Sequence, residues 1–219
     1  MRIATWNVER LRHRASLDEM RGLCESLQAD ILVLTETDSR LLPEYHCAAH
    51  TPLLYEQQPD YYKPTENRVS VFTNYKCVSR YSTYDERTAI CVELKTEYGN
   101  MLVYGTIMGI YGNRHPNFKS DLASQIADFK RLSAVGKPLC VLGDYNLSFS
   151  DNYYFTTHGR DSLLNVFKET NLQILTRNVP ESIDHIAINE DVVRGREIAI
   201  REWNKDKRLS DHKGIMVSF

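Results

Sequence analysis

The sequence predicts an α/β fold with mixed β-sheets, and three observations support this prediction. Apolar runs of strand length recur along the 219 residues, amphipathic helical segments lie between some of them, and the middle of the chain is strand after strand. Because strand and helix alternate only in the first half, a purely parallel doubly wound sheet does not fit. Two mixed sheets packed face to face, with helices on the outside, do fit.

Each expected strand is a short run rich in β-branched and aromatic residues. The expected strands cover residues 2–8, 30–36, 68–74, 88–95, 101–111, 138–145, 182–189, 196–203 and 214–219. No repeat, low-complexity tract or Gly/Ser linker interrupts them, so we expect residues 1–219 to form a single domain.

Two helices are strongly indicated and a third more weakly. The first is expected to begin at Ser16, which forms a capping-box pattern with Glu19. Its apolar positions share one face and are Leu17, Met20, Cys24 and Leu27. The second runs from about Asn117 to Ala134, and a shorter third covers Ser162 to Thr170. The apolar face of the second helix consists of Leu122, Ile126, Phe129 and Leu132.

Composition is that of an ordinary globular protein, with 42% hydrophobic and 26% charged residues. A net charge of −2 provides no overall attraction to nucleic acid or to an anionic membrane, so a polyanionic partner would have to be bound locally. No signal-peptide pattern or membrane-spanning apolar run is present. We therefore expect a cytoplasmic protein without a membrane anchor, and no obligate protein partner is indicated.

The five cysteines support the same expectation. Their number is odd, they contain no C-x-x-C pair, and most lie in apolar stretches. We expect buried thiols in a reducing compartment, and neither a disulfide framework nor a zinc site. The five are Cys24, Cys47, Cys77, Cys91 and Cys140.

Polar side chains stand at the carboxyl ends of three of the most apolar strands. Asn7 follows the first, Glu36 ends the second, and Asp144 with Asn146 ends "LCVLGDYN". A strand that is buried on both faces can carry a carboxylate only where it opens into a crevice. One such acid could be a helix cap or a solvated loop residue. Several carboxylates close together repel one another unless a cation lies between them, and oxygen ligands suit Mg²⁺ or Mn²⁺.

The order of motifs then becomes specific. Five motifs follow one another between Asn7 and His212: W-N-x-E, an apolar strand ending in Glu, G-D-x-N, I-D-H-I and S-D-H. This order resembles the endonuclease/exonuclease/phosphatase superfamily. The resemblance implies a four-layered α/β sandwich that hydrolyses a phosphate ester by direct attack of water, with a divalent cation, Mg²⁺ or Mn²⁺.

The resemblance also implies a metal-binding set. Glu36 matches the main metal ligand of the family, and Asn7 lies beside it, where it would hold metal-bound water or phosphate. Glu9 and Asp211 match further acids near the metal, and Asp211 is also close to the leaving group.

The catalytic roles carry over in the same way. Asp144 matches the acid that orients the attacking water, and Asn146 the amide that contacts phosphoryl oxygens. Tyr111 falls where the family has Tyr or His near the scissile phosphate. His212 would stabilise the transition state as an imidazolium, or act as acid or base.

Two Asp–His dipeptides compete for the catalytic role. Asp184 and His185 lie on one strand, so their side chains point to opposite faces and only one can reach the site. The family pattern selects Asp184 as the residue that orients His212, and leaves His185 in the packing.

The substrate is less well defined by the sequence. The S-D-H motif is followed by Lys213 and Gly214, where the family commonly has an apolar residue and Pro. Asn113 lies in "YGN", which is one residue shorter than the Tyr-x-Pro-Asn of the abasic-site enzymes. Arg10 and Asn113 are nevertheless the expected substrate contacts, together with Asn7, Asn146 and Tyr111.

Basic and aromatic residues gather near the expected crevice. Arg10, Arg12 and Arg14 follow the first strand, and further basic residues surround the last: Arg201, Lys205, Lys207, Arg208 and Lys213. They predict a basic lip, although interleaved acids would also fit a solvated face. The loop after Asn146 carries three aromatic residues, Tyr153, Tyr154 and Phe155. They either pack or stack bases, the latter worth ~1–3 kcal/mol each.

Three functions remain open. The first is a phosphodiesterase or nuclease that acts on DNA or RNA. The alternative is a phosphatase or phosphodiesterase that acts on small phosphorylated metabolites or lipid head groups. A non-catalytic nucleic-acid-binding relative ranks last, because the chain retains every expected ligand and the S-D-H pair.

Overall fold

The computed structural model of the protein describes residues 1–12 and 17–219. The first of its two six-stranded sheets joins both ends of the chain in the order β11-β12-β1-β2-β4-β3. Only β1 and β2 are parallel neighbours. The strands are β1 (Arg2–Asn7), β2 (Ile31–Asp38), β3 (Cys47–His50), β4 (Glu66–Thr73), β11 (Ala199–Trp203) and β12 (Gly214–Ser218).

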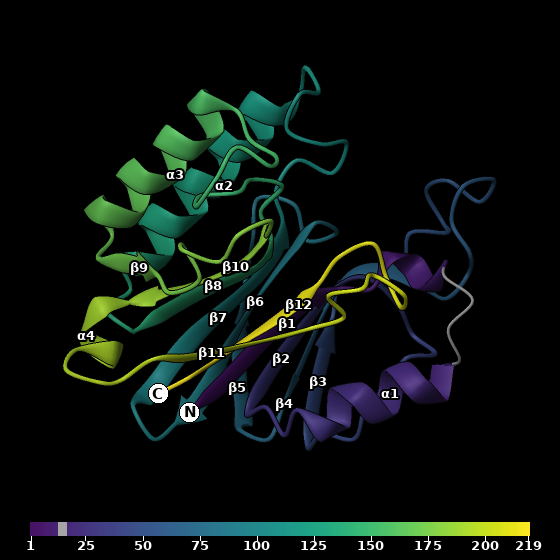
Figure 1. The fold of residues 1–219 in the computed structure, drawn as a ribbon, viewed down its shortest axis with the longest axis horizontal. Helices are drawn as coiled ribbons and strands as arrows, with labels where there is room; N and C mark the ends of the chain where they lie inside the picture. Colours follow the sequence, from purple (N-terminus) through teal and green to yellow (C-terminus); the bar gives the residue numbers. More distant parts are fainter. Residues whose placement is uncertain (13–16) are drawn as a thin grey trace.

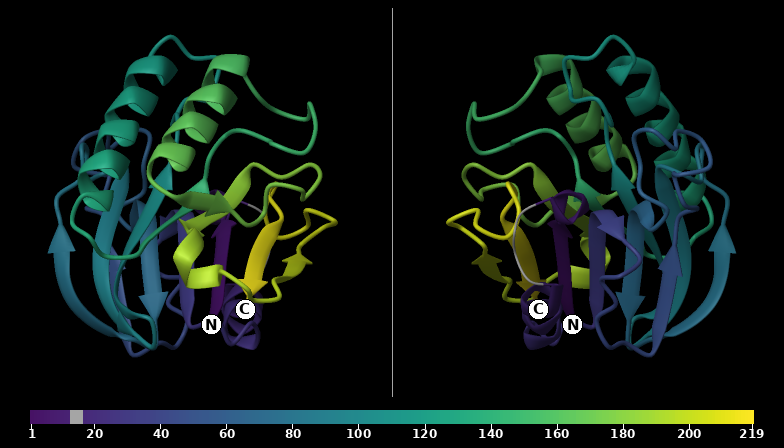
Figure 2. Two further views of the ribbon diagram at one scale, coloured as in Figure 1. Left: turned by 90° about the vertical axis from the view of Figure 1, so that its left-hand side faces the viewer. Right: turned by 90° about the vertical axis from the view of Figure 1, so that its right-hand side faces the viewer.

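The termini lie together at one end of the molecule (Figure 2), where the Met1 amino group donates to the Phe219 carbonyl at 2.7 Å.

The second sheet is built from the middle of the chain in the order β5-β6-β7-β8-β10-β9. Its one parallel pair is β7 and β8, and β10 runs antiparallel to β8. The strands are β5 (Lys76–Tyr81), β6 (Ala89–Thr96), β7 (Gly99–Ile107), β8 (Leu139–Asp144), β9 (Leu172–Ile174) and β10 (Asp184–Asn189).

The helices cover the outer faces of the two sheets (Figure 1). On the first sheet lies α1 (Leu17–Ser26), which buries Met20 and Cys24. On the second lie α2 (Phe118–Ser133) and α3 (Thr157–Glu169). Two shorter elements are η1 (Glu9–Leu11) and α4 (Glu190–Val193). The predicted four-layered sandwich of two mixed sheets with outer helices is therefore confirmed.

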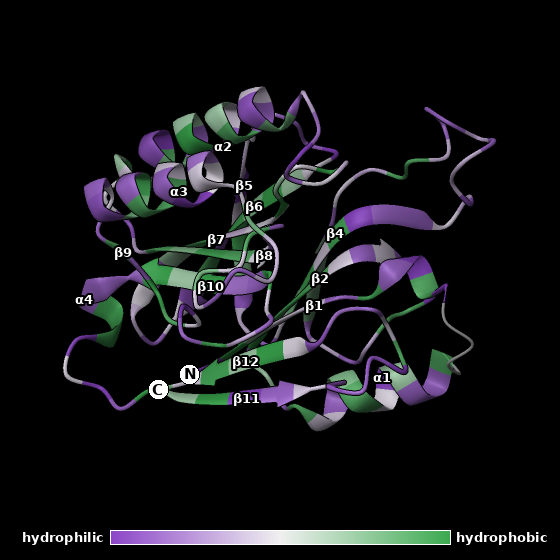
Figure 3. Ribbon diagram, turned by 45° about the horizontal axis from the view of Figure 1, so that its top comes forward, coloured by the Kyte–Doolittle hydropathy of each residue, from purple (hydrophilic) through white to green (hydrophobic). Residues whose placement is uncertain are grey.

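Three apolar clusters hold the layers together. One lies between the sheets, one beneath α2 and α3, and one beneath α1. Figure 3 shows the corresponding pattern, with apolar colour along the strands and mixed colour on the helices. Among residues 1–12 and 17–219, none of the helices has both the length and the apolar composition needed to cross a bilayer.

The expected strands agree with the observed ones to within a few residues, with one consequential exception. β7 ends at Ile107, so Tyr111 lies in the turn that follows and not on the strand. β3, β5 and β9 were not predicted; β3 and β9 are short, and most of β5 is exposed. The Ser16 capping box lies outside the described residues.

The third helix begins earlier than predicted. It starts at Thr157 and not at Ser162, because Thr156 caps it through a hydrogen bond from Gly159 N at 3.2 Å.

The cysteine prediction is wrong for one pair. Cys47 on β3 and Cys77 on β5 form a disulfide, and these are the edge strands of the two different sheets. The bond joins the two sheets on one side of the sandwich. Sequence spacing could not show this contact, because only the packing of the sheets brings the two edges together. Cys24, Cys91 and Cys140 are buried thiols, as predicted.

Candidate active site

The topology brings distant polar residues to one end of the sandwich. β1 and β2 are parallel, so Asn7 and Glu36 emerge at the same edge. In the second sheet Asp144, at the end of β8, pairs in register with Asp184, at the start of β10. The antiparallel β12 begins beside the end of β1, which delivers the residues that precede it to this edge.

Asn7 connects the acids of the two sheets. Its Nδ2 donates to Glu36 Oε1 at 3.3 Å and to Asp144 Oδ2 at 3.0 Å. Its Oδ1 accepts from the backbone N of Glu9 at 2.9 Å, which assigns the orientation of the amide. A carboxylate in this buried position would repel both acids, whereas the amide holds them together.

Asp144 is a buried acid with a strongly perturbed pKa. Its pKa is raised to about 7, chiefly by burial and also by the charge of Asp184, while the neighbouring His212 acts in the opposite direction. A carboxyl group that titrates near neutrality is suited to accepting a proton from water.

Asn146 holds Asp144 in place. Its backbone N donates to Asp144 Oδ1 at 2.8 Å, and it adopts a left-handed φ of 51°, which Asn tolerates well. Its Nδ2 donates to the carbonyls of Met108 and Gly109 at 3.0 and 3.3 Å. The amide therefore ties Asp144 to the turn after β7, and its expected contact with phosphoryl oxygens stays a prediction.

The predicted catalytic histidine, His212, and its predicted partner, Asp184, meet across the two sheets. His212 Nδ1 lies 2.6 Å from Asp184 Oδ2, although the residues are 28 positions apart. Burial disfavours the imidazolium, but the charges of Asp184 and Asp144 outweigh this and raise the pKa of His212 to about 10. The other ring nitrogen, Nε2, lies 3.7 Å from Asp211 Oδ1. At neutral pH His212 is thus a cation with one nitrogen held by Asp184.

The segment before β12 is anchored from several sides. The carbonyl of His212 accepts from Trp6 Nε1 at 3.1 Å and from Asn204 Nδ2 at 2.6 Å. Ser210 Oγ donates to the carbonyl of Asn7 at 2.6 Å, and Asp211 N donates to Glu9 Oε2 at 3.0 Å. The segment before the last strand therefore holds a fixed Asp–His pair beside Asn7 at the end of β1 and Glu9 of η1.

His185 lies on the opposite face of β10, as predicted. It is fully buried, with Nε2 3.0 Å from the Leu147 carbonyl and Nδ1 3.0 Å from Thr176 Oγ1. Burial lowers its pKa to about 4.

His185 should make the protein less stable in mild acid. In the unfolded chain His185 should have the ordinary histidine pKa of about 6.5, so it is protonated below that pH. In the native chain its pKa is about 4, so it stays neutral until the pH falls to about 4. The free energy of unfolding should therefore fall by about 3 kcal/mol from this residue alone between these pH values. Urea titrations at pH 7 and pH 4.5 should show a smaller loss of unfolding free energy on acidification for His185→Gln than for the wild type. His158→Gln, an exposed control on α3, should match the wild type; an unchanged loss in His185→Gln would contradict the assignment.

Arg10 adds no unpaired cation to the predicted basic lip, although it lines a cavity together with Glu36, and its contact with substrate stays a prediction. Its Nη2 lies 2.6 Å from Glu66 Oε2, and its guanidinium lies 4.6 and 4.7 Å from the ring centroids of Tyr61 and Tyr62. The side chain is buried and its charge is paired.

The other end of the expected lip is also partly neutralised. Glu202 pairs with Lys205 at 3.1 Å and with Lys213 at 2.6 Å, and Arg208 pairs with Glu19. Arg12 is exposed, whereas Arg14 lies outside the described residues.

Tyr111 and Asn113 have different surroundings. Tyr111 is 63% exposed, with its ring centroid 4.8 Å from that of His115. Asn113 is buried, and its side-chain Nδ2 donates to the Asn146 carbonyl at 2.8 Å. This hydrogen bond holds the loop that contains Asn146 in place. In the loop itself Tyr153 is exposed, while Tyr154 and Phe155 are partly buried.

Two cavities adjoin the acid cluster. One, of about 300 Å³, is lined by Asn146, Asp184 and His212, with Tyr153 and Lys213. The other, of about 170 Å³, has a different set of lining residues that includes Arg12, Glu36, Tyr62, Arg68 and Tyr111. The Asn7–Asp144 contact lies between them, because Asn7 touches Glu36 of one cavity and Asp144 pairs with Asp184 of the other.

The donor atoms at this edge suit a hard cation. No cluster of three or more His, Cys, Asp or Glu side chains with metal-binding geometry occurs within the described ranges. Glu36 is nevertheless half-buried, and Asp184 Oδ1 is a buried oxygen without a hydrogen-bond partner in the described structure. Mg²⁺ is usually coordinated by only a few protein oxygens, and water molecules complete its coordination shell. Glu36 is the residue that fits such an ion.

Comparison with known proteins identifies the family of the chain. The model of the Endonuclease/Exonuclease/phosphatase family matches residues 4–212, and the chain belongs to this family. Its members are phosphoesterases that generally use a divalent metal. A search of curated proteins found none that matches the chain.

Solved structures show the same fold. The 3′ phosphatase NExo from Neisseria, bound to a product DNA hairpin, is 19% identical with a TM-score of 0.74; the match covers 100% of this chain and 99% of that one. An AP endonuclease from Archaeoglobus fulgidus is 14% identical with a TM-score of 0.68, at the same coverage of 100% and 99%. The human Nocturnin catalytic domain is 15% identical with a TM-score of 0.67, covering 99% and 93%.

Proposed function

We propose that the protein is a metal-dependent phosphodiesterase that hydrolyses backbone or end diesters of DNA or RNA. The observation that carries this proposal is the position of the acid cluster between two cavities. A phosphodiester has a substituent on each side of the phosphorus, and each cavity would receive one of them. The similar Neisseria structure, a 3′ phosphatase bound to a product DNA hairpin, supports a nucleic-acid substrate.

The residues then take complementary parts in the reaction. A divalent cation, Mg²⁺ or Mn²⁺, held by Glu36 would neutralise charge on the phosphate. Asp144 takes a proton from the attacking water as the new P–O bond forms. His212, cationic and oriented by Asp184, stabilises the added negative charge on the phosphoryl oxygens while the bond to the leaving oxygen breaks.

One observation favours the alternative, hydrolysis of a small phosphorylated metabolite or lipid head group. Several cations expected to bind a polyanion are already paired: Arg10 with Glu66, Arg208 with Glu19, and both Lys205 and Lys213 with Glu202. A small substrate needs fewer free cations around the site than a long strand does.

One panel of substrates tests both functions and the metal requirement. The protein is incubated with each substrate in the presence of Mg²⁺, Mn²⁺ or EDTA. The substrates are abasic-site duplex DNA, single-stranded DNA, RNA, bis-p-nitrophenyl phosphate and a small phosphomonoester. We expect cleavage of at least one nucleic acid, falling as salt rises. Strong hydrolysis of the monoester, with activity on DNA absent or independent of salt, would favour the alternative.

The metal requirement should depend on Glu36. We expect no hydrolysis in excess EDTA, full recovery on adding Mn²⁺ or Mg²⁺, and a higher metal concentration for half-maximal activity in Glu36→Gln. Glu169→Gln changes a surface carboxylate on α3 that pairs with Lys130, and it should behave like the wild type. Hydrolysis that continues in excess EDTA would exclude the metal mechanism.

A further inference from the structure

Arg68 is a buried arginine without an acidic partner among the described residues. It lies on β4 with 8% of its surface exposed. Its Nη1 donates to Thr88 Oγ1 at 2.9 Å and its Nη2 to the Tyr62 hydroxyl at 3.4 Å, while its buried Nε has no hydrogen-bond partner in the described part of the chain. Both partners are neutral hydroxyls. A buried cation in this state is costly, and an anionic ligand would compensate it.

Arg68 lies directly beside the candidate metal ligand. In the pairing of β2 with β4, the residue pairs Thr35–Val69 and Thr37–Asn67 leave Glu36 and Arg68 opposite one another. Glu36 has a left-handed φ of 47° at this point. No ion pair within 4.0 Å joins Arg68 to Glu36 or to any other carboxylate of the described ranges. Both side chains instead line the same cavity of about 170 Å³.

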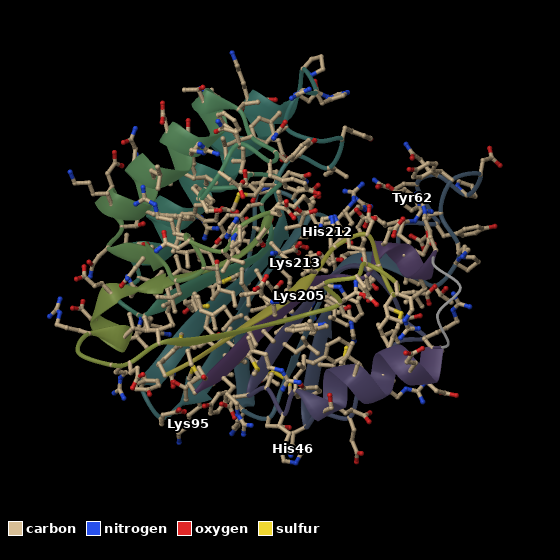
Figure 4. All side chains as sticks on the ribbon, in the orientation of Figure 1. His46, Tyr62, Lys95, Lys205, His212 and Lys213 are labelled. Carbon is tan, nitrogen blue, oxygen red and sulfur yellow. A yellow bond between two sulfur atoms is a disulfide. The ribbon has the colours of Figure 1, made fainter. Side chains whose placement is uncertain are left out.

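Contacts among the lining residues hold one wall of this cavity in place. Arg10 pairs with Glu66 and lies against the rings of Tyr61 and Tyr62, and it donates to the Tyr61 carbonyl at 2.6 Å. Figure 4 labels Tyr62, which belongs to the segment between β3 and β4, and His212 on the C-terminal segment. Because Arg10 fixes Tyr62, the hydroxyl of Tyr62 can orient the guanidinium of Arg68. The exposed Arg12 lies at the same cavity and adds a second positive charge.

We propose that Arg68 binds a second phosphate group of the substrate, next to the phosphodiester that is cleaved. The proposal rests on the proposed function and specifies its substrate class. Neighbouring strands lie about 4.8 Å apart, so a group bound at Arg68 is close to one held at Glu36. Each Nη carries two N–H groups, and Thr88 and Tyr62 engage only one on each, so two Nη–H donors remain for the paired hydrogen bonds with which guanidinium binds phosphate. That phosphate is either a terminal monoester or the next diester of a strand.

The test compares dinucleotides that differ in a single phosphate. The substrates are three forms of the thymidine dinucleotide: one without a terminal phosphate, one with a 5′-phosphate and one with a 3′-phosphate. A trinucleotide without terminal phosphates is the fourth substrate. We expect one added phosphate to raise kcat/KM of the wild type by about 10- to 100-fold, as a pair of charge-assisted hydrogen bonds allows. A gain with a terminal phosphate identifies a monoester end, and a gain only in the trinucleotide identifies a flanking diester.

Three variants assign the effect to Arg68. In Arg68→Met the ratio of rates with and without the added phosphate should fall close to 1, and Arg68→Lys should restore part of it. Arg196→Met is the matched control, because Arg196 is an exposed arginine that lies 4.8 Å from the ring centroid of Tyr98 and lines neither cavity. It should keep the wild-type ratio. Equal ratios in the wild type and in Arg68→Met would overturn the proposal.

A binding measurement separates this proposal from the proposed function. In EDTA, where no hydrolysis is expected, the wild type should bind thymidine 3′,5′-bisphosphate about 10-fold or more tightly than thymidine 5′-monophosphate, and Arg68→Met should bind both alike. If no dinucleotide is cleaved with Mg²⁺ or Mn²⁺ but this difference holds, the proposed function fails and the phosphate site stands. Equal binding of the two by the wild type would overturn the site. Circular dichroism checks that Arg68→Met is folded, and Arg68→Lys replaces it if it is not.

Discussion

Asp144→Asn is expected to lower kcat by about 10²–10⁴-fold, the range for removing a positioned acid or base. Asp144 is the only carboxyl group of the described site that contacts Asn7 and Asn146 together, and burial raises its pKa to about 7. The amide of Asn cannot take a proton from water, but it has nearly the same shape. Substrate affinity should therefore survive, so that kcat falls much more than KM changes.

A buried carboxylate outside the site provides the control. Asp128 on α2 accepts hydrogen bonds from the Tyr84 backbone N and the Tyr104 hydroxyl, and it lines neither of the two cavities. Asp128→Asn should cost stability and leave kcat close to the wild-type value. If Asp144→Asn loses substrate binding while its kcat is kept, Asp144 is a structural residue and the mechanism is wrong.

The second large effect concerns the pair Asp184 and His212. Their 2.6 Å contact holds His212 in one orientation and keeps it cationic, so the two side chains act as one unit. We expect His212→Ala and Asp184→Ala each to lower kcat by large factors. The double variant should be little worse than the worse single variant, because removing either partner already destroys the unit. A kinetic double-mutant cycle measures this coupling.

His185→Ala is the matched variant for this cycle. His185 also follows an aspartate, but its ring faces Leu147 and Thr176 on the other side of β10. It should lose stability in the usual range of about 0.5–3 kcal/mol for a point substitution, and keep kcat. Losses that multiply strictly for Asp184 and His212, or a folded but inactive His185→Ala protein, would show that the wrong pair was chosen.

Much of the site could be predicted because its residues stand where apolar strands end. Asn7, Glu36 and Asp144 interrupt runs that only a buried strand explains, and period-two alternation placed Asp184 and His185 on opposite faces of β10. The contact between Asp184 and His212 came from the family pattern, since the two are far apart in the sequence. The structure places them within hydrogen-bonding distance.

Other features depend on distances that a linear pattern does not contain. Cys47 and Cys77 meet only because two edge strands of different sheets lie side by side. Arg10 and Arg12 lie two residues apart in one basic segment, yet Glu66 of β4 pairs with Arg10 of η1, and the side chain of Arg10 is buried.

The sequence alone thus determined which side chains are buried at strand ends, because burial follows from periodicity and composition. It also determined the family to which the chain belongs. The tertiary structure alone decided which charges are paired and which are not. Arg68 shows the difference: its position on a strand is evident from the sequence, whereas its lack of an acidic partner among the described residues depends on neighbours from other strands. Electrostatic interactions depend on distance in space, and only the packed sheets set those distances.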